Sequence, residues 1–172
     1  MNIRIVPLTT DELAEQWENA FRERGFKRPE GYYSQCLNEN REGKRVTLFA
    51  MADSVIAGCA HLKYVSEYPY FSENGIPEIN DLNVFPEYRR QGIANRMMDA
   101  FERIAAESGP YIGIGVGMFE SYGAAQRLYC RRGYIPDGRG LTYRNAVVDK
   151  GAYVRVDDEL ALYFTKSVRE LN

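Results

Sequence analysis

The sequence predicts one α+β domain built on a mixed sheet. Strand-like segments with alternating apolar residues and helix-like segments with a 3.6-residue period follow one another in mixed order, without repeats or linkers. Of the 172 residues, 45% are apolar and 27% are charged, which is typical of a packed domain. A chain of this length buries about two-thirds of its unfolded surface, enough for a core without metal or disulfide staples. We therefore expect a single domain over residues 1–172.

The first half of the chain predicts two helices among three strands. The expected elements are a strand over 2–8, a helix from Thr10, a shorter helix over 29–40, and hairpin strands over 46–51 and 55–64. Thr10 suits the N-cap of the first helix. The apolar face of that helix carries Leu13, Trp17, Ala20 and Phe21. Residues 66–77 are expected to form a loop rich in aromatic and acidic side chains, which would suit a cationic amine.

The second half continues the alternation of helices and strands. The expected elements are a strand over 78–85, a helix over 91–108, a strand over 111–119, a helix over 121–132, and strands over 141–144 and 160–166. Pro86 ends the first of these strands because proline cannot continue the hydrogen-bond ladder. Gly133 suits the C-terminal cap of the last helix because glycine adopts left-handed backbone without strain.

Composition argues against several classes of function. The formal net charge of −2 disfavours non-specific nucleic-acid binding, which depends on an excess of Lys and Arg. The three cysteines are dispersed and the single histidine, His61, has no ligand-like neighbours, so we expect no metal, no disulfide framework and a structural role for His61. No apolar run approaches the length of a membrane span, so we expect no membrane association and a cytoplasmic protein.

The segment from Val84 to Ala94 has the features of an anion-binding turn. A strand ends at Pro86, Arg89 and Arg90 follow, and Gly92 opens a helix. The first N–H groups of a helix have no intrahelical acceptor and lie at the positive end of its dipole. Gly92 lets an anion approach the backbone closely, so the pattern suits a pyrophosphate. A capped helix with surface arginines would show the same residues.

Two blocks of the chain resemble the GNAT family of N-acetyltransferases. Residues 89–94 read RRQGIA, similar to the family motif Q/R-x-x-G-x-G/A, and residues 82–86 match its L-x-V-x-P lead-in. The second block, over 124–134, is similar to the family pattern A-x-x-L-Y-x-x-x-G-F/Y. The resemblance implies a GNAT-like acyl-CoA N-acyltransferase fold, in which a mostly antiparallel sheet, flanked by helices, is splayed between strands 4 and 5.

The resemblance also implies which residues hold acetyl-CoA. The strand end would pair with the pantetheine amides, Val84 N–H would polarise the thioester carbonyl, and the loop would hold the pyrophosphate. The cofactor-binding residues expected on this basis are Leu82, Asn83, Val84, Arg89, Arg90, Gln91, Gly92, Ile93, Ala94 and Asn95. The alternating glycines over 113–117 are expected to serve the gap for the pantetheine arm. Family members often contact the cofactor through an asparagine where this chain has Tyr122, so that contact is not carried over.

Tyr129 matches the tyrosine that in this family protonates the departing CoA thiolate. A phenol with a pKa of about 10 is protonated at neutral pH and suits that task. The amine must also lose a proton, and Glu78 lies six residues before Val84, where some family members place a glutamate base. Asp81 is the alternative base, followed by Glu120. A regular strand would direct Asp81 to the face opposite Glu78, whereas a bulge would reverse this parity.

These residues lead to one expected function and two alternatives. We expect an acetyl-CoA-dependent N-acetyltransferase that transfers acetyl to a primary amine of a small molecule or peptide by direct attack in a ternary complex. The alternatives are a non-catalytic acyl-CoA-binding sensor or interaction module on the same fold, and a nucleotide-binding module that uses only the helix at Gly92. Residues 138–172 extend beyond the matched blocks and are expected to shape the acceptor pocket or a dimer edge, so a homodimer stays open.

Overall fold

The computed structural model describes residues 2–169, which divide into two compact units. The first unit comprises the chain up to Lys63 together with Asn80–Phe101. The second comprises Tyr64–Ile79 together with the chain from Glu102. Two segments, the strand that contains Ile79 and the helix that contains Phe101, therefore begin in one unit and end in the other.

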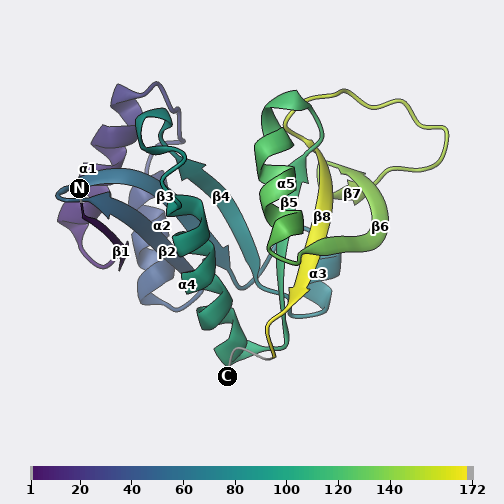
Figure 1. Cartoon of the computed structure of the whole chain (residues 1–172), viewed down its shortest axis with the longest axis horizontal. Helices are drawn as coiled ribbons and strands as arrows, with labels where there is room; N and C mark the ends of the chain where they lie inside the picture. Colours follow the sequence, from purple (N-terminus) through teal and green to yellow (C-terminus); the bar gives the residue numbers. More distant parts are fainter. Residues whose placement is uncertain (1, 170–172) are drawn as a thin grey trace. The chain divides into compact units, whose positions relative to one another are not determined.

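The first unit contains most of the expected N-terminal elements (Figure 1). They are β1 (Ile3–Pro7), α1 (Asp11–Glu23), α2 (Tyr32–Arg41), β2 (Arg45–Ala52), β3 (Val55–Lys63), the end of β4 (Glu78–Val84), the 3₁₀ turn η1 (Pro86–Tyr88) and the start of α4 (Ile93–Ser108). Thr10 caps α1 as expected, because its hydroxyl accepts a hydrogen bond from Leu13 N–H at 3.2 Å.

Helices cover both faces of β2 and β3. Trp17 and Phe21 of α1 and Leu37 of α2 are buried in one cluster with Phe49 of β2. Figure 1 shows α4 on the opposite face of these strands. Because both faces are covered, the residues over Leu48–Ala52 are all buried instead of alternating between core and solvent.

β4 carries a bulge in its middle. Asp81 has a φ of +53°, a left-handed conformation that a regular strand does not contain. Of the two strand geometries that the sequence left open, the bulged one is present. Beyond the strand, Phe85 N–H donates to Ala57 O at 2.9 Å, which ties the end of β4 to β3.

The second unit is built on the antiparallel strands β5, β8, β6 and β7, together with the start of β4 and several helices. Its elements are α3 (Pro69–Glu73), the start of β4, the end of α4, β5 (Tyr111–Gly117), η2 (Glu120–Tyr122), α5 (Gly123–Arg131), β6 (Ile135–Tyr143), β7 (Ala146–Val147) and β8 (Leu160–Ser167). β5 pairs with β8 along its whole length, from Tyr111↔Ser167 to Gly117↔Ala161. Gly133 has a φ of +83° after α5, so the expected helix cap is confirmed.

Two segments differ from the sequence prediction. The expected loop over 66–77 contains α3, which Pro69 opens and which buries Phe71. β6 begins at Ile135 instead of at residue 141, because Ile135 and Pro136 pair with β8 before the register shifts. Gly138 and Gly140 make this segment look like a loop in the sequence, because glycine is uncommon in strands. The segment belongs to the sheet because it pairs with β8.

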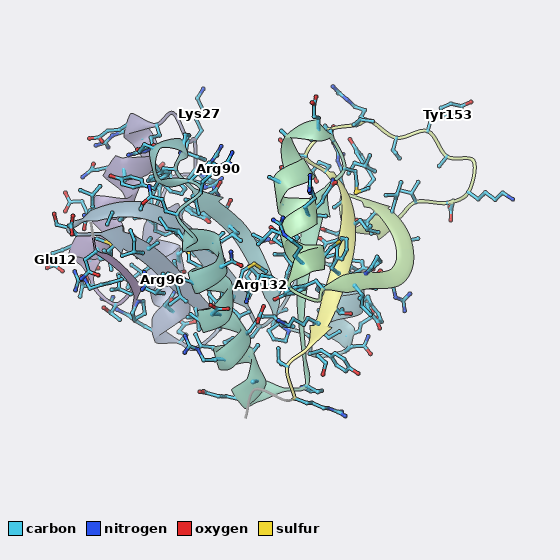
Figure 2. The ribbon with its side chains drawn as sticks, in the orientation of Figure 1. Glu12, Lys27, Arg90, Arg96, Arg132 and Tyr153 are labelled. Carbon is cyan, nitrogen blue, oxygen red and sulfur yellow. The ribbon has the colours of Figure 1, made fainter. Side chains whose placement is uncertain are left out.

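A buried carboxylate joins three elements of the second unit. Glu102, 4% exposed on α4, binds Lys166 Nζ at 2.7 Å and Arg132 Nη2 at 3.0 Å, and it accepts a hydrogen bond from the Tyr134 hydroxyl at 3.1 Å. Figure 2 labels Arg132. Burial and the neighbouring Glu102 raise the pKa of Tyr134, so its hydroxyl remains a donor to the carboxylate. The network locks α4, β8 and the segment after α5 together.

The strands follow the hydrogen-bonded order β1-β2-β3-β4-β5-β8-β6-β7. The pair β4–β5 is parallel, joining Glu78 to Gly113 and Ile79 to Ile114, and the sheet is otherwise mostly antiparallel. The expected α+β class, a mostly antiparallel sheet flanked by helices, is confirmed. Among residues 2–169, no helix combines the length and the apolar character needed to cross a membrane.

Candidate active site

The turn between β4 and α4 has the backbone geometry of an anion site. Arg90 and Gly92 adopt left-handed conformations, with φ values of +62° and +76°. Arg96 N–H donates to Gly92 O at 3.1 Å, so Gly92 precedes the first turn of the helix. The N–H groups of Ile93 and Ala94 therefore lack an acceptor within α4. These donors lie at the positive end of a long helix, which favours a phosphate or pyrophosphate group.

The two arginines of this turn have different surroundings. The Arg89 Nε donates to Val84 O at 2.9 Å and so binds the last carbonyl of β4. Arg90 is exposed and extends from the turn (Figure 2). A cavity of about 610 Å³ adjoins the turn, and its lining residues are Glu23, Arg24, Phe26, Pro86, Glu87 and Arg89. Arg90 is thus able to add charge beside a phosphate, whereas Arg89 primarily shapes the turn.

Asp81 is held by a cation and an amide. Its carboxylate forms an ion pair with Arg28 Nη2, and its Oδ1 accepts a hydrogen bond from Asn83 Nδ2 at 2.7 Å. Arg28 in turn lies over the rings of Phe21 and Tyr32, at 5.6 and 5.4 Å. Both oxygens of the Asp81 carboxylate are therefore already engaged by partners of the chain. This arrangement favours a structural role for Asp81 at the bulge.

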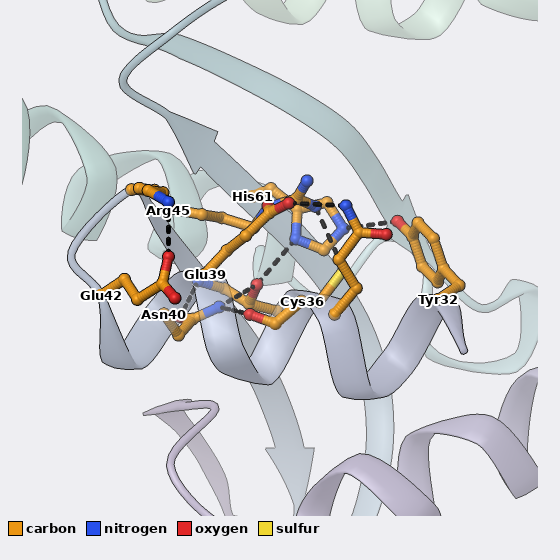
Figure 3. A network of polar contacts seen from close by, with 10 residues as sticks. Tyr32, Cys36, Glu39, Asn40, Glu42, Arg45 and His61 are labelled. Atoms are coloured by element: carbon orange, nitrogen blue, oxygen red, sulfur yellow. Dashed lines mark hydrogen bonds and ion pairs between the residues drawn. The ribbon is translucent and has the colours of Figure 1, made fainter.

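His61 belongs to a closed polar network in the first unit (Figure 3). Its Nδ1 lies 2.9 Å from Thr47 Oγ1 and its Nε2 lies 3.3 Å from the Tyr32 hydroxyl. Asn40 completes the network by donating to Thr47 Oγ1 at 2.9 Å and accepting from Thr47 N–H at 2.7 Å. Burial, with Arg45 nearby, lowers the pKa of His61 well below its ordinary value. His61 is a neutral, satisfied histidine of the sheet, as the sequence predicted.

Glu78 begins β4 inside the second unit. It is 4% exposed, and its backbone pairs with Gly113 of β5. Its Oε2 accepts a hydrogen bond from the Ser66 hydroxyl, whose oxygen accepts Tyr68 N–H at 3.0 Å. No sequence motif indicates Ser66, because the contact joins residues 12 positions apart across a loop. A buried carboxylate oriented by a hydroxyl suits the role of a general base.

Tyr129 lies in α5 and is 6% exposed. Within residues 2–169 its hydroxyl has no hydrogen-bond partner, and its ring contacts Tyr134 at a centroid distance of 6.2 Å. Burial, with a smaller contribution from Tyr122, raises the pKa of Tyr129 to about 12. The hydroxyl therefore keeps its proton at neutral pH and is available to donate it to a bound group.

The alternating glycines of β5 accommodate aromatic rings of the chain itself. A Cβ atom on Gly113 would overlap the Phe71 ring, and one on Gly117 would overlap the Tyr122 ring. A Cβ atom on Gly115 would meet the Tyr163 ring in the same way, at 2.8 Å. On this face of β5 the space beside the glycines is therefore occupied by three rings of the second unit, and a role of these glycines in a gap for the pantetheine arm stays a prediction.

Tyr122, at the position where the family often has asparagine, is itself fixed by a contact. Its hydroxyl donates to Asp158 Oδ1 at 2.7 Å, and its ring packs over Gly117. Sequence reasoning could not find this pair, since 36 positions separate the two residues. The hydrogen bond connects the residue that precedes α5 to the segment that leads into β8.

The family described as "Acetyltransferase (GNAT) family" matches residues 8–134. A search of curated proteins finds no match.

Solved structures of acetyltransferases share the fold of this chain. The fold is similar to that of an N-acetyltransferase from Staphylococcus aureus Mu50, with a TM-score of 0.71, 14% identity and coverage of 98% of this chain and 100% of that one. It is also similar to Arabidopsis thaliana NAA60 in complex with acetyl-CoA, with a TM-score of 0.68, 18% identity and coverage of 96% and 98%. A third similar structure is that of a Salmonella typhimurium acetyl transferase that modifies the N-terminal serine of ribosomal protein L7/L12. Its TM-score is 0.70 at 10% identity, and the match covers 97% of this chain and 95% of that one. At these identities the likeness concerns the fold.

Proposed function

Since the chain belongs to the acetyltransferase (GNAT) family, whose match spans more than half of its length, we propose that it is an acetyl-CoA-dependent N-acetyltransferase. The acceptor is a primary amine of a small molecule or peptide, and the amine attacks the thioester directly in a ternary complex. Acetyl-CoA bound to the Arabidopsis neighbour supports this cosubstrate.

The turn at Gly92 is the observation that carries the proposal. Two left-handed residues, Arg90 and Gly92, leave the first N–H groups of α4 next to the exposed Arg90 side chain. This combination of backbone donors, helix dipole and cation suits the pyrophosphate of CoA. The residues proposed to hold the cosubstrate are Leu82, Asn83, Val84, Arg89, Arg90, Gln91, Gly92, Ile93, Ala94 and Asn95.

Glu78 and Tyr129 supply the proton transfers in this proposal. The carboxylate of Glu78 accepts a proton from the acceptor ammonium, directly or through water, and the neutral nitrogen attacks the thioester carbonyl carbon. The C–N bond forms, the C–S bond breaks, and the thiolate takes the proton of the Tyr129 hydroxyl. The proton that the nitrogen loses as the amide forms passes, directly or through water, to the Tyr129 phenolate and restores its hydroxyl. Val84 N–H stabilises negative charge on the carbonyl oxygen. Asp81 is the less favoured base because Arg28 pairs with it.

The test is the release of CoA thiol from acetyl-CoA across a panel of amino acids, polyamines, aminoglycosides and peptides. With a productive acceptor, Tyr129→Phe should lower kcat by up to the roughly 10²- to 10⁴-fold typical of general acid catalysis. Tyr111→Phe removes a hydroxyl from a half-exposed ring of β5 and is the matched control, which should keep the wild-type rate. An unchanged rate in Tyr129→Phe would remove this residue from the mechanism.

Ligand binding separates the proposal from its alternatives. CoA and acetyl-CoA should raise the melting temperature, whereas ATP and NAD should not. Stabilisation by ATP but not by CoA would indicate a nucleotide-binding module. Stabilisation by acetyl-CoA without turnover on any acceptor of the panel would indicate a non-catalytic acyl-CoA sensor.

A further inference from the structure

The second unit contains a small cavity that the proposed proton transfers do not use. Its volume is about 170 Å³, and its lining residues are Tyr68, Pro69, Tyr70, Glu73, Arg139, Asn145, Ala146 and Val147. They come from α3, β6, β7 and the adjoining turns. Sites for drug-sized ligands measure roughly 300–1,000 Å³. This cavity therefore suits one end of a molecule.

Arg139 is an exposed residue of β6 whose side chain lines this cavity. Gly138 and Gly140 on either side of it have φ values of +84° and +77°, and its own N–H donates to Asp137 Oδ1 at 2.9 Å. Its guanidinium carbon lies 4.0 Å from the centroid of the Tyr70 ring. The face of Tyr70, which the sequence suggested for a substrate cation, is thus already covered by a cation of the chain.

The N–H donors of the Arg139 guanidinium are available to a ligand. Among residues 2–169 this guanidinium forms no ion pair and no side-chain hydrogen bond. The nearby Asp137 is occupied, since its Oδ1 accepts the Arg139 backbone N–H and its Oδ2 accepts the Tyr68 hydroxyl at 2.7 Å. Glu73, the acidic residue of the lining, is exposed and does not pair with Arg139.

Asn145 adds a second donor to the same lining. Its Oδ1 accepts the Tyr163 hydroxyl at 2.7 Å, which leaves the two N–H bonds of its amide for another acceptor. The Tyr163 ring is itself held in place, because it stacks on the Tyr68 ring with the ring centroids 3.9 Å apart and an interplanar angle of 8°. One cavity is thus lined by a guanidinium that stacks on an aromatic face and by an amide that a tyrosine orients, and both groups donate hydrogen bonds of the kind that a carboxylate accepts.

We propose that this cavity binds the carboxylate of the acceptor, so that the substrates are amines that also carry one carboxylate, such as amino acids. The inference rests on the proposed function, because it names the substrate of that site. The cavity and the base are linked within the second unit, since Tyr68 lines the cavity and its N–H binds the Ser66 hydroxyl that donates to Glu78.

The test compares amines that differ only in the carboxylate: phenylalanine with phenethylamine, and lysine with cadaverine. The wild-type protein should acetylate the carboxylate-bearing member of each pair with the lower KM. Arg139→Gln should raise that KM by roughly 10- to 100-fold, the value of one charge-assisted hydrogen-bonded pair, and should leave the KM for acetyl-CoA unchanged. Arg139→Lys keeps the charge and should restore part of the affinity.

Arg155→Gln is the matched control. It removes the same charge from an 85% exposed side chain in the same unit but outside the cavity, and should leave both KM values unchanged. A second readout needs no turnover: phenylalanine, added to the ¹⁵N-labelled protein, should shift the Nε–Hε signal of Arg139.

The outcomes separate the two proposals. Equal KM values for the paired amines, or an unchanged KM in Arg139→Gln, would overturn the carboxylate site and leave the proposed function standing. If no amine is acetylated but phenylalanine shifts the Arg139 signal, the proposed function fails, and with it the role of the cavity in acceptor binding, whereas binding of a carboxylate in the cavity stands. If no amine is acetylated and phenylalanine does not shift the Arg139 signal, both proposals are overturned.

Discussion

Gly58 of β3 lies directly against the carbonyl of Asn83 in β4: a Cβ atom built on Gly58 would come within 2.6 Å of Asn83 O. The bulge at Asp81 brings the β4 backbone this close, and the obstacle is backbone, which cannot rotate away as a side chain would. A side chain at Gly58 would therefore push against the end of β4, which leads into the turn at Gly92.

Gly58→Ala should displace the end of β4. We expect a loss of about 1–3 kcal/mol in the free energy of unfolding, as for other overpacked positions, and weaker acetyl-CoA binding. Urea unfolding and calorimetric titration measure the two effects. Gly109→Ala is the control, because its φ is not left-handed and, apart from its chain neighbours, no atom of residues 2–169 lies within 4 Å of where a Cβ would be. Equal stability of both variants would show that β4 tolerates the extra carbon.

Gly92→Ala should weaken CoA binding beyond its effect on stability. A residue with a Cβ loses about 1 kcal/mol of stability in the left-handed conformation of Gly92, whose φ is +76°. If the backbone leaves this conformation, the N–H groups at the start of α4 point in a different direction. Gly43→Ala is closely matched, with a φ of +71° and, in the described part of the chain, open space where a Cβ would be. Both variants should lose similar stability in urea, but only Gly92→Ala should raise the Kd of CoA. A similar rise in Gly43→Ala would contradict the role of the turn.

Tyr129 should make stability depend on alkaline pH. Burial raises its pKa to about 12 in the folded protein, against about 10 in an unfolded chain. A raised pKa stabilises the fold fully below about pH 10, and this contribution disappears as the pH rises to about 12. The difference amounts to roughly 2–3 kcal/mol. The wild-type protein should therefore lose more stability than Tyr129→Phe over this range in urea unfolding, whereas Tyr153→Phe, at a fully exposed ring, should follow the wild type.

Glu78→Gln and Asp81→Asn should affect different properties. Glu78→Gln removes the proposed base and should lower kcat by roughly 10²- to 10⁴-fold with little change in KM for acetyl-CoA. Asp81→Asn breaks the ion pair with the half-buried Arg28 and should chiefly reduce stability, by about 1–3 kcal/mol. Steady-state kinetics and urea unfolding of both variants measure this contrast. The opposite pattern would assign the base to Asp81.

Glu102→Gln should strongly destabilise the second unit. The substitution leaves Lys166 and Arg132 without their carboxylate in a buried setting, and breaking a buried pair costs about 3–5 kcal/mol. Glu42→Gln removes a carboxylate from the exposed pair with Lys44 and should leave the urea midpoint unchanged. Similar midpoints for the two variants would mean that the network at Glu102 contributes little.

Local features of the chain were predictable because neighbouring residues determine them. The cap at Thr10 and the turn at Gly133 follow from side-chain and backbone preferences within a few residues, and the structure confirms both. The start of β6 was not predicted, because it depends on residues that are distant in the sequence. Its glycines favour a loop locally, and the pairing of Ile135 and Pro136 with β8, about 30 residues away in sequence, overrides that preference.

The sequence by itself determined the order of most elements (not α3 or β7), the family and the candidate turn at Gly92, because periodicity, turn residues and short motifs are properties of adjacent positions. The tertiary structure alone decided which charged groups meet. It paired Asp81 with Arg28, gave Glu78 the hydroxyl of Ser66, and put the guanidinium of Arg139 over Tyr70, with no anionic partner among residues 2–169. Charge and hydrogen-bond partners depend on distances across the fold, which a local pattern does not contain.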